Sequence, residues 1–293
     1  MKEHTRRQPM TNKQNDIQYN TGRFAHYDAE TMPYKKYNHF AHFALTDALI
    51  AHAGETEQPI IHFWQTPPLV ILGMMDTRVG HFEESLTVFD DYQHEVIVRN
   101  SGGLGVISDP GVLNVSLIYP TKNERLTIDR GYQFMLQFIR DTFYPHFTEK
   151  TIEAFEISNS YCFGEFDLSI DGRKIAGIAQ RRIQNGIAVM LYISVNGDQQ
   201  KRAEMMQEFY ARALDGSEPA GRYPEIIPGV MTTLEEAYGT SFTVSEVKEM
   251  MLRQFESYEG DYSVTIDEHF NEGLEKMYRR NKRVFSEEIL PEA

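Results

Sequence analysis

Cysteine is nearly absent from this chain, since Cys162 is the only one in 293 residues. A single thiol cannot form an intramolecular disulfide, and zinc sites need further Cys or His ligands at spacings that this sequence lacks. Two interpretations of Cys162 remain open. It is either a buried small apolar residue, the common fate of free cysteine, or a nucleophile.

Long hydrophobic runs are also missing. No stretch approaches the roughly 18 uninterrupted apolar residues of a membrane span. Residues 1–30 are mostly polar, mixed in charge and without the apolar segment of a secretory signal, so we expect a disordered N-terminal lead-in there. Together with the single thiol, these features predict a cytoplasmic protein with no membrane partner.

Positive charge is in short supply. The chain carries 29 Lys and Arg against 43 Asp and Glu, a net charge of −14 at pH 7. Nucleic-acid binding needs a basic face, so we expect no nucleic-acid partner. The basic runs Arg181-Arg182 and residues 279–283 are too short for such a face, and the second is most simply the solvated face or tail of a C-terminal helix.

Gly/Ser linkers and internal repeats are absent, and from Pro33 onward helical and strand-like segments alternate. We therefore predict one α/β domain over residues 31–260, followed by a C-terminal helical extension or tail over residues 261–293. Predicted helices cover residues 43–53, 131–143, 199–214, 232–238 and 243–255. Predicted strands lie within residues 59–73, interrupted at Pro67-Pro68, and over residues 95–99 and 112–119.

A three-stranded antiparallel meander is predicted over residues 166–195. Asp171-Gly172 and Asn185-Gly186 separate strand-like segments, and these dipeptides supply the positive φ angles of two-residue hairpin turns. In the second of these strands, Lys174 falls opposite Ser169 across the first turn.

The same alternation sets Lys174 on the face of Ala176, Ile178 and Gln180. Because small residues follow it, Lys174 either points into an open cleft or lies in solvent, and both interpretations stand. A straight strand would hold Cys162 roughly 20 Å from Lys174 at ~3.3 Å per residue. The two residues meet only if residues 157–165 leave the sheet and fold back, with Gly164 as a plausible bend.

Residues 99–105, Arg-Asn-Ser-Gly-Gly-Leu-Gly, form a glycine-rich loop after a strand. The loop lacks both nucleotide-binding fingerprints, so it is either a place of close ligand approach or an ordinary turn. His62, Trp64 and His94 have no ligand-like spacing and are interpreted as core or surface residues.

These segments together resemble the biotin and lipoate protein ligase/transferase superfamily, over about residues 33–255. The resemblance rests on residues 98–106 with Asp109, on residues 113–116, and on residues 167–177. Tyr161-Cys162 and residues 179–182 are similar to its octanoyltransferase branch.

The resemblance implies a mixed, largely antiparallel sheet flanked by helices, with an acyl tunnel beneath the glycine loop. It implies that Cys162 carries octanoyl as a thioester and that Lys174 contacts the acyl carbonyl. The substrate-binding residues that it implies are Arg99, Ser101, Gly102, Gly103, Leu104, Asn114 and Gly177.

The reaction implied is transfer of octanoyl from a lysine of the glycine cleavage H protein to a lysine of the lipoyl domains of 2-oxoacid dehydrogenase E2 subunits. It calls for no metal and no organic cofactor. In this chemistry the Cys162 thiolate attacks an amide through an oxyanion, and a nearby Lys174 ammonium stabilises both the thiolate and the oxyanion.

Three alternatives stay open. In the first, the octanoyl donor is acyl carrier protein. In the second, the enzyme is an ATP-dependent lipoate ligase. In the third, the domain binds an acyl group without catalysis. Leu104 stands where the ligases have a third glycine, and Ser108 where they have a histidine. Leu104 narrows the room for an adenylate beside the backbone, which disfavours ATP use.

Overall fold

The architecture comes from a computed structural model of the chain, which describes residues 18–31, 39–123, 125–216, 223–263 and 267–285. Residues 1–17 of the expected lead-in lie outside this part. The rest of the lead-in is not disordered, because Arg23–Asp28 forms strand β1. β1 pairs in parallel with its neighbours on both sides, so its backbone groups are used by the sheet.

The core of the fold is a mixed sheet. Within the described residues it holds eight strands in the order β11-β1-β2-β6-β10-β9-β8-β7. β11, β1 and β2 run parallel, and every other neighbouring pair is antiparallel. The mixed, largely antiparallel sheet expected from the sequence is thus confirmed. Besides β1, its strands are β2 (Ile60–Trp64), β6 (Val112–Pro120), β7 (Ile152–Ala154), β8 (Leu168–Ile170), β9 (Arg173–Ile183), β10 (Gly186–Ser194) and β11 (Glu256–Glu259).

A smaller sheet carries the glycine loop. Its strands, in the order β4-β3-β5 within the described residues, are β3 (Leu69–Leu72), β4 (Glu95–Val98) and β5 (Val106–Ser108). The predicted break at Pro67-Pro68 separates β2 from β3. Arg99 to Gly105 connects β4 to β5, so both ends of the glycine loop are held by one sheet.

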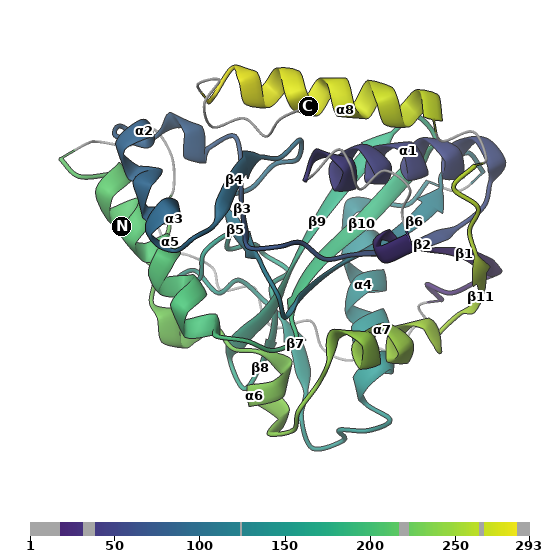
Figure 1. Cartoon of the computed structure of the whole chain (residues 1–293). Coiled ribbons are helices and arrows are strands. Elements are labelled where there is room, and N and C mark those ends of the chain that lie inside the picture. The colour runs from purple at the N-terminus through teal and green to yellow at the C-terminus, as the bar shows by residue number, and fades with distance from the viewer. Residues whose placement is uncertain (1–17, 32–38, 124, 217–222, 264–266, 286–293) are drawn as a thin grey trace, which may run out of the picture.

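Helices cover both faces of the large sheet (Figure 1). α1 packs against one face and α8 packs along α1, while α4 and α7 cover the other face. The helices are α1 (Phe40–Thr56), α2 (Phe82–Ser85), α3 (Thr87–Asp91), α4 (Ile128–Phe143), α5 (Gln199–Ala213), α6 (Leu234–Tyr238), α7 (Val244–Leu252) and α8 (Asp267–Lys282). No helix among the described residues is long and apolar enough to cross a membrane.

Strand β6 shows how alternation assigns side chains to the two faces. Leu113, Val115 and Leu117 pack into the core beneath α4 and α7, as period-two patterning predicts. Asn114 and Ser116 face the other way, towards α1. The polar side chains are buried there, so this face of the sheet contains a polar site rather than a purely apolar core.

The predicted meander is present as β8, β9 and β10. Asp171 and Gly172 have φ angles of 51° and 74°, which confirms the first turn. The second turn was predicted one residue too late. It consists of Gln184 and Asn185, with Gln184 at a φ of 48°, because Gly186 already pairs with Ile183 in the ladder.

The C-terminal helix α8 is tied to the smaller sheet. Asn281 is fully buried, and its side chain accepts a hydrogen bond from Val98 N (2.8 Å) and donates one to Val98 O (3.1 Å). Phe270 and Met277 of the same helix belong to the core between α1 and the sheet. α8 therefore supports the strand that leads directly into Arg99.

Candidate active site

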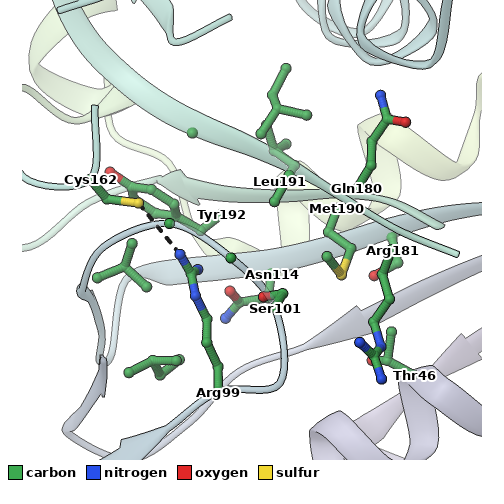
Figure 2. A pocket seen from close by; sticks show the side chains of 18 of the residues that line it. Thr46, Arg99, Ser101, Asn114, Cys162, Gln180, Arg181, Met190, Leu191 and Tyr192 are labelled. Carbon is green, nitrogen blue, oxygen red and sulfur yellow. Dashed lines mark hydrogen bonds between the residues drawn. The ribbon is translucent and has the colours of Figure 1, made fainter. Parts of the chain in front are cut away.

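A cavity of about 290 Å³ lies on the α1 face of the large sheet, beside the glycine loop (Figure 2). β6, β9 and β10 contribute to its lining, together with α1 and the loop that contains Cys162. Its apolar wall includes Phe43, Trp64, Ile71, Val106, Met190 and Leu191. Trp64, interpreted from sequence as a core or surface residue, is a buried lining residue. The cavity thus joins an apolar compartment to a set of reactive side chains.

The segment between β7 and β8 carries Cys162 to this cavity. It leaves the sheet and folds back, as the distance between Cys162 and Lys174 required. Asp167 Oδ2 accepts hydrogen bonds from the backbone N–H groups of Ile157 (3.3 Å) and Gly164 (3.2 Å), which closes the loop on itself. Cys162 adopts a φ of 49°, a region that non-glycine residues rarely occupy and that surrounding contacts must hold.

Lys174 supplies those contacts. Its Nζ donates to Ser160 Oγ (3.1 Å), Tyr161 O (3.2 Å) and Cys162 O (2.8 Å), and it forms an ion pair with Asp167 Oδ1 (2.9 Å). The side chain is 0% exposed, so the interpretation as a solvent-exposed turn lysine is wrong. The loop therefore already brings Cys162 to Lys174, through the hydrogen bond from Lys174 Nζ to the Cys162 carbonyl oxygen.

A β-bulge explains why Lys174 lies on the same side of the sheet as the cavity, although it is not one of the residues that line it. Lys174 pairs with Ser169 as predicted, but the register then shifts and Leu168 pairs with Ala176. The extra residue changes the face, because a strand alternates with period two. Ala176 packs beneath α4, whereas Lys174 lies beside Tyr192 on the cavity side, so the predicted shared face with Ala176 is wrong.

The buried ion pair gives Asp167 an unusual environment. Burial raises the pKa of the Asp167 carboxyl, while Lys174 and the N–H groups of Gly164 and Ile157 oppose that rise. The carboxylate is therefore tolerated because its neighbours supply charge and hydrogen bonds. Sequence analysis included Asp167 in a motif but assigned it no role.

Arg99 reaches the sulfur from the opposite side. Its Nη2 donates to Leu104 O (2.9 Å) and to Cys162 Sγ (3.5 Å; dashed in Figure 2). Gly103 makes this approach possible. Its φ is 96°, and a Cβ atom there would lie 2.5 Å from Arg99 Nη2.

The remaining predicted substrate-binding residues fall into two groups. Ser101, Gly102, Asn114 and Gly177 line the cavity with Arg99 and Gly103. Leu104 does not, because its side chain is buried away from the cavity and its carbonyl instead holds Arg99. A Cβ atom on Gly177 would lie 2.8 Å from the Tyr192 ring, so this glycine keeps the wall of the cavity open.

Sequence analysis missed a second charged pair in the cavity. Arg181 donates to Asp47 Oδ2 (2.6 Å) and to Asn100 O (2.8 Å), which links β9 to α1 and to the glycine loop. Burial raises the pKa of Asp47, and Arg181 opposes that rise. Arg181 stood in the motif that supported the resemblance, but nothing local connects it with a residue 134 positions away.

No group of three or more His, Cys, Asp or Glu side chains in the described ranges is placed to hold a metal ion. The cavity brings together the Cys162 thiol, the guanidinium of Arg99 beside its sulfur and an apolar compartment. This combination suits acyl transfer through a covalent intermediate.

Comparison with protein families finds a match to the lipoyl protein ligase A/B catalytic domain over residues 38–256. Among curated proteins, the octanoyl-[GcvH]:protein N-octanoyltransferase of Bacillus velezensis is 39% identical over 83% of this chain and 87% of its own length. Proteins of the same name from Anoxybacillus flavithermus and Oceanobacillus iheyensis are 42% and 35% identical, over 73% and 93% of this chain and 76% and 99% of their own.

Solved structures of lipoate ligases share the fold. Lipoate-protein ligase A bound with ATP superposes with a TM-score of 0.65 at 16% identity, covering 88% of this chain and 96% of its own. A bipartite lipoate protein ligase from Thermoplasma acidophilum gives a TM-score of 0.63 at 16% identity, covering 92% and 99%. At these identities the likeness concerns architecture.

Proposed function

Because the chain belongs to the lipoyl protein ligase A/B catalytic-domain family, we propose that it is an octanoyltransferase that uses Cys162 as its acyl carrier. The donor is the octanoyl-lysine of the glycine cleavage H protein, and the acceptor is the lysine of lipoyl domains of 2-oxoacid dehydrogenase E2 subunits. The observation that carries the mechanism is the position of the chain's sole cysteine, in the cavity between Arg99 and the Lys174 contacts.

The first half of the reaction forms a thioester. The Cys162 sulfur attacks the carbonyl carbon of the octanoyl-lysine amide, and the carbonyl oxygen becomes an oxyanion. The C–N bond then breaks, and the proton that the thiol gives up ends on the leaving lysine nitrogen. In the second half, an uncharged lysine of the acceptor attacks the thioester, the C–S bond breaks, and the amine proton returns to the sulfur.

Lys174 lies where it would serve the oxyanion. Its ammonium is bonded to the backbone carbonyl of Cys162, so exchanging that carbonyl for the acyl oxygen requires little movement. The ion pair with Asp167 fixes the position of the ammonium. Because the ammonium is buried, water screens its attraction for an oxyanion only weakly. The apolar wall of the cavity would hold the octanoyl chain, with Gly177 and the glycine loop lining its path.

The transfer exchanges one lysine amide for another, so its free-energy change is close to zero. A nucleophile that divides the transfer into two steps lowers the activation barrier without shifting the equilibrium. We therefore expect transfer without ATP, in both directions, with little acyl-enzyme accumulating from an amide donor.

Intact-mass spectrometry of protein mixtures tests this function. Octanoylated H protein with an unmodified lipoyl domain should yield octanoylated domain, and the reverse mixture should return octanoyl to H protein. Cys162→Ala should fold and transfer nothing, while Arg182→Met, which removes an exposed charge outside the cavity, should behave as wild type.

Two results would count against the proposal. Wild-type turnover by Cys162→Ala would end the covalent mechanism. No exchange between the two proteins, combined with efficient transfer from octanoyl-acyl carrier protein, would identify the other donor. Modification that requires free lipoate and ATP would identify a ligase.

A further inference from the structure

The Lys174 ammonium contacts oxygen atoms around Cys162 and not its sulfur. Lys174 Nζ is directed at four oxygen atoms, which exceeds the three N–H groups that an ammonium carries. It is fully buried, so a new acceptor must displace an existing one. Lys174 therefore holds the backbone of the Cys162 loop, and another side chain contacts the sulfur.

That group is Arg99. Its Nη2 lies 3.5 Å from Cys162 Sγ, and its hydrogen bond to Leu104 O fixes the guanidinium in that direction. Gly103 leaves the space that this approach needs, because a Cβ atom there would meet both Arg99 Nη2 (2.5 Å) and Cys162 Sγ (3.5 Å). The glycine loop thus brings a permanent positive charge to the thiol.

Arg99 also retains a donor that nothing satisfies. Its Nε is buried and has no hydrogen-bond partner within the part of the chain that the structure describes. Buried N–H groups are rarely left unpaired, and such exceptions often mark a place where a ligand or water binds. Arg99 lines the cavity, so an acyl carbonyl oxygen entering beside Cys162 is a fitting partner for this group.

We propose that Arg99 is a catalytic residue of the transfer, which stabilises the Cys162 thiolate before substrate arrives and donates to the acyl oxygen as it becomes an oxyanion. Lys174 acts with it, after first holding the loop. The proposal rests on the proposed function for its second part only, because the effect on the thiolate is independent of what the enzyme transfers.

Alkylation by iodoacetamide tests the first part, and the single cysteine makes its signal unambiguous. In Arg99→Gln, which removes the charge but keeps a donor for Leu104 O, alkylation at neutral pH should slow roughly tenfold or more. The two rates should converge as the pH is raised, because added base then removes the thiol proton without help from Arg99. Arg99→Lys should be alkylated at close to the wild-type rate. The charge control Arg182→Met should also be alkylated at the wild-type rate.

Octanoylation of Cys162 by a small octanoyl thioester, followed by intact mass, tests the second part. Arg99→Lys keeps the charge but not the planar set of donors, so it should be octanoylated about 10²-fold more slowly while being alkylated normally. Circular dichroism checks the fold of each variant, and the lysine variant remains informative if the glutamine variant does not fold.

Neutral-pH alkylation of Arg99→Gln at the wild-type rate, or slowed by the same factor at every pH, would overturn the role at the thiolate. Normal octanoylation of Arg99→Lys would overturn the role at the oxyanion. If wild type itself gains no octanoyl, the proposed acyl carrier fails, and the alkylation series still decides whether Arg99 serves the sulfur.

Discussion

At the scale of single residues, the buried side chain of Lys174 contributes to stability, and we propose that it also takes part in the transfer. Its ammonium is paired with Asp167 and bonded to the loop that carries Cys162. Removing a partner from a buried ion pair leaves an uncompensated charge, which costs more than the pair itself contributes. Variants at this position therefore affect stability as well as transfer.

Lys174→Met should lose transfer by ~10² or more, the scale for removing one oxyanion donor. It should also unfold more easily at neutral pH, by about 3–5 kcal/mol, because Asp167 is left buried and unpaired. Burial raises the Asp167 pKa, and without Lys174 that rise is opposed less. The folded variant then keeps a proton that the unfolded chain has released, so its stability falls as pH rises.

Urea unfolding of Lys174→Met and wild type at pH 5 and pH 8 measures this effect. The stability difference should be larger at pH 8. The double variant Lys174→Met with Asp167→Asn is the matched control and should remove most of the pH dependence. A difference that is the same at both pH values would show that Asp167 is not the group responsible.

At the scale of elements, the segment between β7 and β8 is an anchored loop. Backbone N–H groups of Ile157 and Gly164 bond Asp167, Ser160 N donates to Ile157 O (2.9 Å), and Asp167 N donates to Gly164 O (3.2 Å). A straight strand would separate Cys162 from Lys174, so the sequence predicted that residues 157–165 fold back. The loop already brings them together through these bonds.

Hydrogen exchange at residues 157–165 should therefore be slow in the free protein and change little when octanoyl is bound. Asp167→Asn weakens the acceptor of two of these bonds and should accelerate exchange there, but not in α4 (Ile128–Phe143). Mass spectrometry of peptic fragments resolves both segments. Fast exchange in the free protein that slows on acylation would show instead that residues 157–165 close when the acyl group binds.

At the scale of the whole molecule, the candidate active site depends on a helix outside the matched family region, which ends at residue 256. α8 packs along α1 and binds both backbone groups of Val98 through Asn281. Arg99 follows directly, so the position of its guanidinium is set partly by the C-terminal helix.

Asn281→Ala should lower the free energy of unfolding by about 1–3 kcal/mol, because Val98 loses partners for buried backbone groups. Glu275→Ala, an exposed position on the same helix, should change stability by no more than ~0.5 kcal/mol. Chemical denaturation of the three proteins provides the comparison. Equal stability of wild type and Asn281→Ala would mean that α8 does not support β4.

Local sequence determined much of the fold. Alternation in residues 112–119 predicted a strand and its two faces correctly, and the Asp171-Gly172 turn predicted the pairing of Ser169 with Lys174, since both depend on residues a few positions apart. The motifs around the glycine loop and the meander were enough to indicate the family. The roles of Cys162, Lys174 and Arg99, which the resemblance implied, remain predictions for the experiments above.

Only the tertiary structure decided how those residues meet. Three features have no local signature in the sequence. They are the bulge that sets the face of Lys174, the contact of Arg99 with a sulfur 63 positions away, and the Asp47–Arg181 pair. Each arises where the packing of α1, the glycine loop and the Cys162 loop closes one cavity. Such contacts are long-range, and the chain's short-range periodicities carry no information about them.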